Sequence, residues 1–262
     1  MNLILIWGKF LEKFENRIGS PYWRLRNYGF SGLIRYIWFD KLRFSHKFQY
    51  DFRLITNQSE FRDYLEGATS RKIDLERSNI AVDDFCKVFM ETDLSEGESK
   101  KSAQDLLSTR NRLFALAGVS LATKPDVYVE TGTQHGTSSA FMATLFADSI
   151  SKLYSIDVLD MPKYLSSDKI QYLIYDKQVR KSIKKLSAEL TAKRTLFFHD
   201  SDHSFENIAW ELNFAWNSLK AIAIVVDDAL GNDAFIKFAH KNQLPLILYQ
   251  FDGGPAVGMI IR

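Results

Sequence analysis

The chain has 262 residues, of which 46% are hydrophobic and 25% are charged, and its formal net charge is +2. These values are typical of a folded globular protein and exclude an intrinsically disordered chain. The single cysteine, Cys86, excludes an internal disulfide framework, and no run reaches the roughly 20 apolar residues that a membrane-spanning helix needs. The apolar start at residues 3–7 is too short for a signal peptide, so we expect a cytoplasmic protein.

Residues 1–50 form a basic, aromatic segment with nine Lys or Arg, three acidic residues and thirteen aromatic side chains. Three interpretations stay open. The aromatic side chains can pack against the rest of the protein, the segment can lie on an anionic membrane surface, or it can grip nucleic acid by charge and stacking. We rank packing first and peripheral membrane contact through residues 1–50 second. Nucleic acid is not expected because no binding motif accompanies the segment. A homodimer interface would also suit it.

A polar, charged stretch at residues 91–102 predicts a linker. We place the main boundary there. Residues 1–101 are then a basic, aromatic-rich helical extension or cap, and residues 102–262 are the main domain. A helix is expected to begin at Ser102 and to end at Gly118, because apolar residues recur at helical spacing between them.

From Pro125 onward, short β-rich runs alternate with helical stretches, which is the pattern of βαβ units and a parallel sheet. Strands are expected at residues 127–130, 153–156, 170–175, 195–199 and 221–226. Residues 246–251 and 256–261, separated by a glycine turn, predict a hairpin. The predicted fold class is therefore α/β, with a Rossmann-like, doubly wound, mostly parallel seven-stranded sheet and an antiparallel C-terminal hairpin.

A glycine-containing turn separates the first of these strands from the helix after it, and its sequence is Glu130-Thr131-Gly132-Thr133-Gln134-His135-Gly136. The two glycines let a ligand approach the backbone, and the helix start offers free N–H groups. A pyrophosphate site would carry Gly-x-Gly-x-x-Gly, but Thr133 stands where the second glycine belongs. Glu130 would repel a pyrophosphate and could hold an ammonium group, which argues against NAD.

Asp157 ends the next predicted strand, 25 residues after Gly132. A carboxylate at this position can accept hydrogen bonds from both ribose hydroxyls of a nucleotide-like ligand. Taken alone, Asp157 would more simply be a helix cap or a solvated turn residue. The glycine turn upstream favours the ribose role.

These segments, together with residues 198–207 and Val225-Val226-Asp227-Asp228, resemble class I S-adenosylmethionine-dependent methyltransferases of the Methyltransferase-24 type. The resemblance covers about residues 103–262. It implies S-adenosylmethionine bound across the strand tips, with Glu130 and Gly132 near the methionine part, Asp157 on the ribose, and Asp176 and Lys177 beside the adenine. The implied cofactor residues are Glu130, Thr131, Gly132, Thr133, Gly136, Thr137, Ser138, Asp157, Asp176, Lys177 and Asp200.

Four carboxylates follow the fourth and fifth predicted strands: Asp200, Asp202, Asp227 and Asp228. Carboxylates in one crevice repel unless a cation or protons compensate, and Mg²⁺ with oxygen ligands would do so. By the resemblance, Asp200, Asp227 and Asp228 would be metal ligands, and Asp202 or His203 would be the base. The alternative is that Asp200 and Asp227 cap helices.

The resemblance implies methyl transfer to an oxygen, with a hydroxyl of a sugar or small molecule as the acceptor. Two alternatives stay open. A hydroxylase would need a site for iron, and no cluster of two histidines and a carboxylate is evident. A non-catalytic scaffold could keep the fold and dock to a membrane. Arg110 and Arg112 either reach an anionic acceptor or lie on a solvated helix face, and Trp210 and Trp216 are expected in the core.

Overall fold

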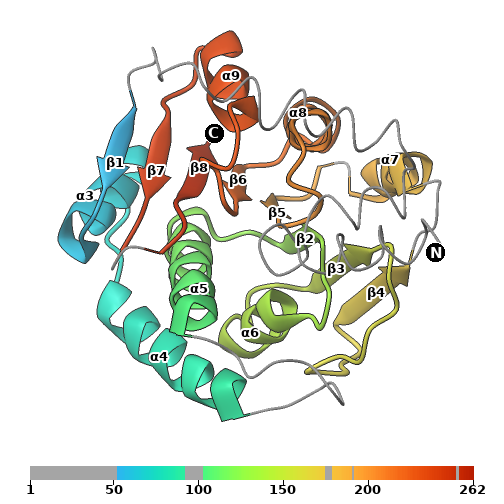
Figure 1. Ribbon diagram of the computed structural model, residues 1–262, viewed down its shortest axis with the longest axis horizontal. Coiled ribbons are helices and arrows are strands. Elements are labelled where there is room, and N and C mark those ends of the chain that lie inside the picture. The colour runs from blue at the N-terminus through green and yellow to red at the C-terminus, as the bar shows by residue number, and fades with distance from the viewer. Residues whose placement is uncertain (1–51, 92–102, 175–178, 191, 252–253) are drawn as a thin grey trace, which may run out of the picture. The chain divides into compact units, whose positions relative to one another are not determined.

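The computed structural model describes residues 52–91, 103–174, 179–190, 192–251 and 254–262 (Figure 1). The chain divides into two units, Met1–Gln49 and Tyr50–Arg262, and the described residues belong to the second. Among them, no helix has both the length and the apolar composition needed to cross a membrane. The interpretations of residues 1–50 lie outside the described residues.

The second unit is built on one sheet of eight strands in the order β1-β7-β8-β6-β5-β2-β3-β4. The strands are β1 (Arg53–Ile55), β2 (Val127–Thr131), β3 (Lys152–Asp157), β4 (Ile170–Ile174), β5 (Thr195–His199), β6 (Ala223–Val226), β7 (Ile247–Tyr249) and β8 (Val257–Ile261). Strand β8 is antiparallel to both of its neighbours, β6 and β7, and the other pairings are parallel. The predicted α/β class and its C-terminal hairpin are confirmed.

Helices cover both faces of the sheet (Figure 1). One face carries α3 (Gln58–Thr69), α4 (Leu75–Glu91), α5 (Ala103–Thr123) and α6 (Thr137–Leu145), and the other carries α7 (Val179–Glu189), α8 (Phe205–Asn213), the π-helical turn η3 (Phe214–Ser218) and α9 (Ala234–Lys241). Side chains alternate along each strand, so Tyr128 enters the first core while Val127 and Val129 enter the second. Trp210 and Trp216, expected in the core, are only partly buried and pack against the second core.

The sheet has one strand more than the seven predicted. Strand β1 pairs in parallel with β7, and Ile55 at its end is fully buried. Helices α3 and α4 pack in the same core as α5, so residues 53–91 belong to the compact unit rather than to a separate extension ending at residue 101. With only three residues, β1 is too short to show a period-two pattern.

Helix α5 continues past Gly118, where the sequence predicted its end, as far as Thr123. A Cβ atom at Gly118 would lie 2.6 Å from the ring of Phe61 in α3. The glycine therefore serves close packing between two helices and does not end one.

Strand β2 lies where the chain reverses direction across the sheet. The chain runs from β2 through β3 to β4 on one side, then returns to form β5 on the other side of β2. In open α/β sheets, ligands bind at the carboxyl ends of the strands beside such a switch point. The tips of β2 and β5 are therefore where we place the candidate site.

Candidate functional site

The turn after β2, residues 130–136, is called the cofactor turn below. Gly132 and Gly136 have φ angles of +83° and +75°, in the left-handed region that favours glycine. A Cβ atom at Gly132 would lie 2.0 Å from the carbonyl oxygen of Asp200. The backbone N–H of Asp200 in turn donates to the carbonyl of Thr131 over 3.0 Å. Gly132 thus lets the tips of β2 and β5 lie in contact. From the sequence, this glycine had been explained by the close approach of a ligand.

Glu130 presents an unsatisfied carboxylate oxygen inside the cofactor turn. The Tyr128 hydroxyl donates to Glu130 Oε2 over 2.7 Å. Glu130 Oε1 and Thr133 Oγ1 are buried and have no hydrogen-bond partner within the part of the chain that the structure describes. Burial raises the pKa of Glu130 to about 7. A buried, unpaired carboxylate oxygen fits a ligand ammonium group such as that of S-adenosylmethionine.

Asp157 links the end of β3 to the cofactor turn. Its carboxylate accepts hydrogen bonds from the backbone N–H groups of Gln134 at 2.6 Å, Val158 at 2.6 Å and Leu159 at 2.9 Å. A carboxylate has further lone pairs, so Asp157 can hold the turn and still accept from a ribose hydroxyl.

The loop after β3 contacts the outer side of the cofactor turn. Lys163 donates to the carbonyl of Gln134 at 2.6 Å, and the N–H of Tyr164 donates to the carbonyl of His135 at 2.9 Å. Thr137 and Ser138 are buried in the first turn of α6. Asp176 and Lys177, the predicted adenine neighbours, lie outside the described residues.

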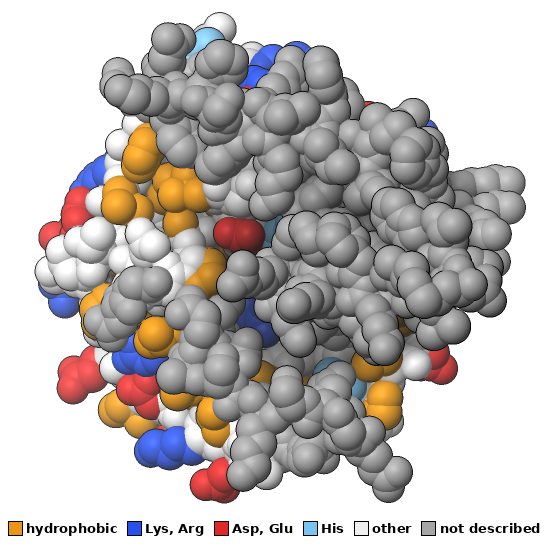
Figure 2. All heavy atoms as spheres, in the orientation of Figure 1, with side chains coloured by type: hydrophobic (Ala, Val, Ile, Leu, Met, Phe, Trp, Pro, Cys, Tyr) orange, Lys and Arg blue, Asp and Glu red, His pale blue; other side chains and the backbone are white. Residues whose placement is uncertain are grey.

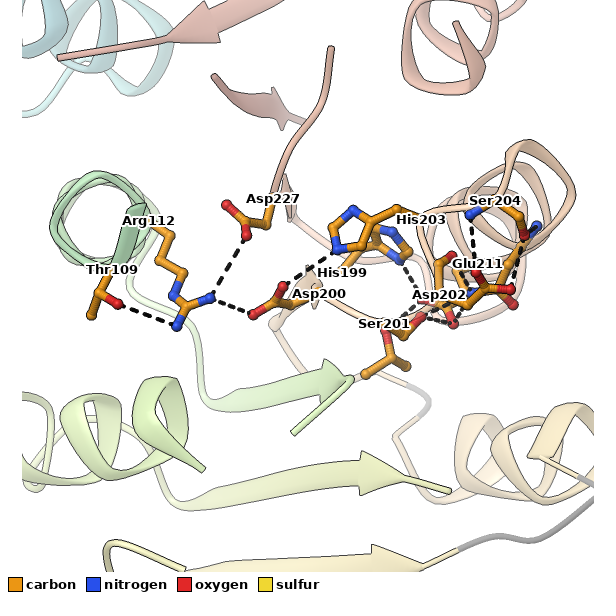
Figure 3. A network of polar contacts seen from close by, with 12 residues as sticks. Thr109, Arg112, His199, Asp200, Ser201, Asp202, His203, Ser204, Glu211 and Asp227 are labelled. Carbon is orange, nitrogen blue, oxygen red and sulfur yellow. Dashed lines mark hydrogen bonds and ion pairs between the residues drawn. The ribbon is translucent and has the colours of Figure 1, made fainter. Parts of the chain in front are cut away.

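Arg112, Asp200, His203 and Asp227 form the carboxylate cluster (Figure 3). Arg112 Nη1 of α5 lies 2.9 Å from Asp200 Oδ2 and 3.7 Å from Asp227 Oδ2. His203 Nε2 lies 3.6 Å from Asp200 Oδ1. His203 has 32% of its side chain exposed. On the face viewed in Figure 2, the described side chains are a mixture of hydrophobic, acidic and basic groups.

Charge within the carboxylate cluster is balanced by its own residues. Burial alone would raise the pKa of Asp200, but the charge of Arg112 and the nearby imidazole of His203 lower it. Burial and the charge of Asp200 raise the pKa of Asp227 to about 7. Burial opposes protonation of His203, yet the negative charges of Asp200 and Asp227 beside it raise its pKa to about 9. At neutral pH two cations therefore face Asp200 and Asp227.

Three residues of the carboxylate cluster also form a candidate cation site. One ligand atom each from Asp200, His203 and Asp227 lies within 4.8 Å of the others. Asp227 Oδ1 and His203 Nδ1 are buried and lack a hydrogen-bond partner among the described residues. Asp228, the third ligand expected from the sequence, is not in this group and adopts a φ of +45°. The donor set fits a divalent ion, but Arg112 already contacts both carboxylates.

Asp202 faces away from the carboxylate cluster, towards the start of α8 (Figure 3). Its carboxylate accepts from the backbone N–H of Ser204 at 3.2 Å and from the Ser204 hydroxyl at 3.0 Å. Ser204 is the N-cap of α8 and accepts from the N–H of Asn207. Asp202 therefore helps to shape the loop that begins this helix.

A second polar network, which the sequence did not predict, lies on the other face of β5. Glu211 of α8 is buried and accepts hydrogen bonds from four side chains, and we call this set the Glu211 network: His199, Thr131, Ser201 and Asn207. Burial would raise the pKa of Glu211, but the charge and hydrogen bond of His199 lower it. One feature of the sequence could have indicated this network: Glu211 places a carboxylate between Ile208 and Leu212 on the apolar face of α8.

The two arginines considered from the sequence have different roles. Arg112 is mostly buried and points to the strand tips, whereas Arg110 pairs with Asp83 of α4 at 2.7 Å and with Asn79 at 3.1 Å. Arg110 therefore joins α5 to α4, and only Arg112 reaches the candidate site.

Comparisons with known proteins show the family of this chain. The sequence profile of the family described as rhamnosyl O-methyltransferase/CmcI matches residues 99–243, more than half of the chain. A search among curated proteins found no match.

Solved structures of methyltransferases are similar at low identity. An SAH-bound methyltransferase from Podospora anserina has 13% identity and a TM-score of 0.45, with 81% of this chain and 99% of that chain covered. A protein assigned as an O-methyltransferase from Klebsiella pneumoniae has 14% identity and a TM-score of 0.43, with coverages of 77% and 96%. A protein assigned as a ribosomal RNA methyltransferase from Plasmodium falciparum has 10% identity and a TM-score of 0.36, with coverages of 53% and 87%.

The family match spans the cofactor turn, β5 and every residue of the carboxylate cluster. The first and last residues of that cluster, Arg112 and Asp227, both lie within residues 99–243. The chain therefore belongs to the rhamnosyl O-methyltransferase/CmcI family and is a class I S-adenosylmethionine-dependent methyltransferase.

Proposed function

We propose that the enzyme transfers the methyl group of S-adenosylmethionine to a hydroxyl oxygen of a small-molecule or saccharide acceptor bound beside the carboxylate cluster. One observation carries this proposal. The backbone N–H of Asp200 donates to Thr131 of the cofactor turn, while its carboxylate belongs to the carboxylate cluster. A methyl donor on one side of Asp200 and an acceptor on the other would be within reach of each other, as methyl transfer requires.

Placement of the cofactor follows from the charges at the strand tips. Glu130 would pair with the ammonium group, the N–H groups at the start of α6 would face the polar part of the cofactor, and Asp157 would accept from the ribose. The proposed contacts also include Thr131, Thr133, Thr137 and Ser138, and Asp176 and Lys177 beside the adenine.

The chemistry asks little more of the protein than alignment and removal of one proton, because S-adenosylmethionine supplies an activated methyl group. Asp202 and His203 were the bases expected from the sequence. His203 holds a proton at neutral pH in its present contacts, and the Asp202 carboxylate faces Ser204. Asp227 Oδ1 is buried and has no hydrogen-bond partner among the described residues, and Asp227 is therefore our preferred proton acceptor.

Magnesium assistance is the finer part of the proposal. Asp200, Asp227 and the neutral form of His203 would hold the ion, in place of the set Asp200, Asp227 and Asp228 expected from the sequence. When bound, the ion would favour the ionised form of an acceptor hydroxyl.

Two measurements test the proposal. Calorimetric titration with S-adenosylhomocysteine should show binding to the native chain and weaker binding to Glu130→Gln and Asp157→Asn, in buffer with and without Mg²⁺. Incubation with S-adenosylmethionine carrying an isotopically labelled methyl group, with a panel of hydroxyl-bearing acceptors, should then give a product whose methyl resonance marks attachment to oxygen. A label found only on nitrogen, sulfur or carbon would contradict the acceptor class. Absence of cofactor binding would favour the scaffold alternative.

A further inference from the structure

Arg112 has an unusual position for a charged side chain of a core-facing helix. Helix α5 packs its apolar side chains against the sheet, with Leu113, Leu116 and Ala117 fully buried. Arg112 lies near the middle of this helix, keeps only 18% of its side chain exposed, and directs its guanidinium to the tips of β5 and β6. Burying a charge in this way is stable only where opposite charges meet it.

The contacts of the guanidinium fix where its charge lies. Nη1 lies between the two carboxylates, at 2.9 Å from Asp200 Oδ2 and 3.7 Å from Asp227 Oδ2. Nη2 contacts the Thr109 hydroxyl at 3.5 Å, one helical turn earlier on α5. The facing oxygens of Asp200 and Asp227 are thus bridged by a cation that belongs to the chain.

A divalent ion that binds both carboxylates through these facing oxygens competes directly with the guanidinium. Mg²⁺ and Mn²⁺ bind carboxylate oxygens at a distance near 2.1 Å. An ion that bridged Asp200 Oδ2 and Asp227 Oδ2 would stand in the position of Nη1, and the two positive charges would repel.

We infer that Arg112 occupies the cation position of the carboxylate cluster, so that a divalent ion binds Asp200 and Asp227 only after the guanidinium has left. The inference deepens the proposed function, on which it rests for the identity of this cluster as the acceptor site. It assigns to Arg112 the charge compensation that was expected of Mg²⁺.

The size of the effect follows from the population of the form in which Arg112 has left the carboxylates. A minor conformation of a folded protein is commonly populated at roughly 0.1–10%. The apparent affinity for an ion that binds only this form is reduced by the same fraction. Removing Arg112 should therefore tighten divalent-ion binding by about tenfold or more.

The test is titration with Mn²⁺ alone, followed by the electron paramagnetic resonance signal of the free ion, which does not depend on methyl transfer. The native chain is compared with Arg112→Met, with Arg112→Lys, and with the double variant Arg112→Met, Asp227→Asn. Arg110→Met is the matched control, because Arg110 lies on the same helix and pairs with α4. Calorimetry with S-adenosylhomocysteine shows separately whether each variant keeps the proposed cofactor site.

We expect weak Mn²⁺ binding by the native chain and by Arg110→Met, much tighter binding by Arg112→Met, and loss of that binding in the double variant. Arg112→Lys should stay close to the native chain because it keeps a positive charge. If Arg112→Met is unstable, Mn²⁺ should raise its melting temperature and leave that of the native chain unchanged. Equal Mn²⁺ affinity of the native chain and Arg112→Met, or no binding by either, would overturn the inference.

Discussion

Substitution of Gly132 by alanine should destabilise the protein strongly, because two costs coincide at this residue. A non-glycine residue in the left-handed region costs about 1–2 kcal/mol, and Gly132 has a φ of +83°. The added Cβ would also lie 2.0 Å from the carbonyl oxygen of Asp200 and 2.5 Å from the Cα of Ser201. Both are backbone atoms, so the tips of β2 and β5 must separate.

Separation of the two tips would break the hydrogen bond from the Asp200 N–H to the Thr131 carbonyl, and its loss adds about 1 kcal/mol to the destabilisation. With the strain of the displaced loop included, we expect a loss of about 3–5 kcal/mol in the free energy of unfolding. That is a large fraction of the roughly 5–15 kcal/mol that stabilises a typical domain.

Urea denaturation followed by tryptophan fluorescence measures this loss, and calorimetry measures the affinity for S-adenosylhomocysteine. Gly67→Ala is the matched control. Gly67 lies in α3, and a Cβ there would meet no atom within 4 Å. This control should stabilise the protein by about 0.5–1 kcal/mol.

The result can also separate two roles of Gly132. If Gly132→Ala unfolds at the same urea concentration as the native chain, the argument from the Asp200 contact is refuted. A loss of S-adenosylhomocysteine binding with unchanged stability would instead mean that the glycine is needed for approach of the ligand, as the sequence alone suggested.

Four other substitutions test the site. Burial raises the pKa of Glu130 from 4.5 to about 7, so the folded protein keeps a proton that the unfolded chain releases. The stability that this proton contributes is fully present below pH 4.5 and is lost as the pH rises through about 7. Between these pH values the urea midpoint of Glu130→Gln should therefore change less than that of the native chain. Glu211→Leu should cost about 3–5 kcal/mol, measured by urea denaturation, because His199 and Thr131 lose their buried partner; an unchanged midpoint would contradict the importance of this network. Asp227→Asn should lower the methyl-transfer rate by about 10²–10⁴-fold, whereas Asp202→Asn should change mainly stability. Equal rate losses in these two variants would argue against Asp227 as the proton acceptor.

The sheet and the cofactor turn were predictable from local patterns. Buried strands such as β5 and β6 are continuous apolar runs, and the predicted strand at residues 195–199 matches β5. The glycines of the turn have the positive φ angles that their type suggests. Local sequence determines both features, because each depends on the burial or the backbone freedom of consecutive residues.

Contacts between distant elements were not predictable in the same way. Whether Arg112 faced solvent or the strand tips depended on the rotation of α5 about its axis, and its partners are 88 and 115 positions away. Glu211 has the same difficulty, since it joins α8 to β2 and β5. A charged residue on an apolar helix face marks a buried partner without showing which residue it is.

Alternation along β5 explains why one strand tip serves two networks. His199, the last residue of β5, directs its side chain to α8 and Glu211, and Asp200 directs its side chain to α5 and Arg112 (Figure 3). The backbone from the Asp200 carbonyl to the Cα of Ser201 contacts Gly132. Because β2, α5 and α8 all contact these two consecutive residues, the protein itself holds the carboxylate of Asp200 in place. Methyl transfer depends on such prior alignment, so loss of the Glu211 network should impair the reaction even though Glu211 itself faces away from the acceptor.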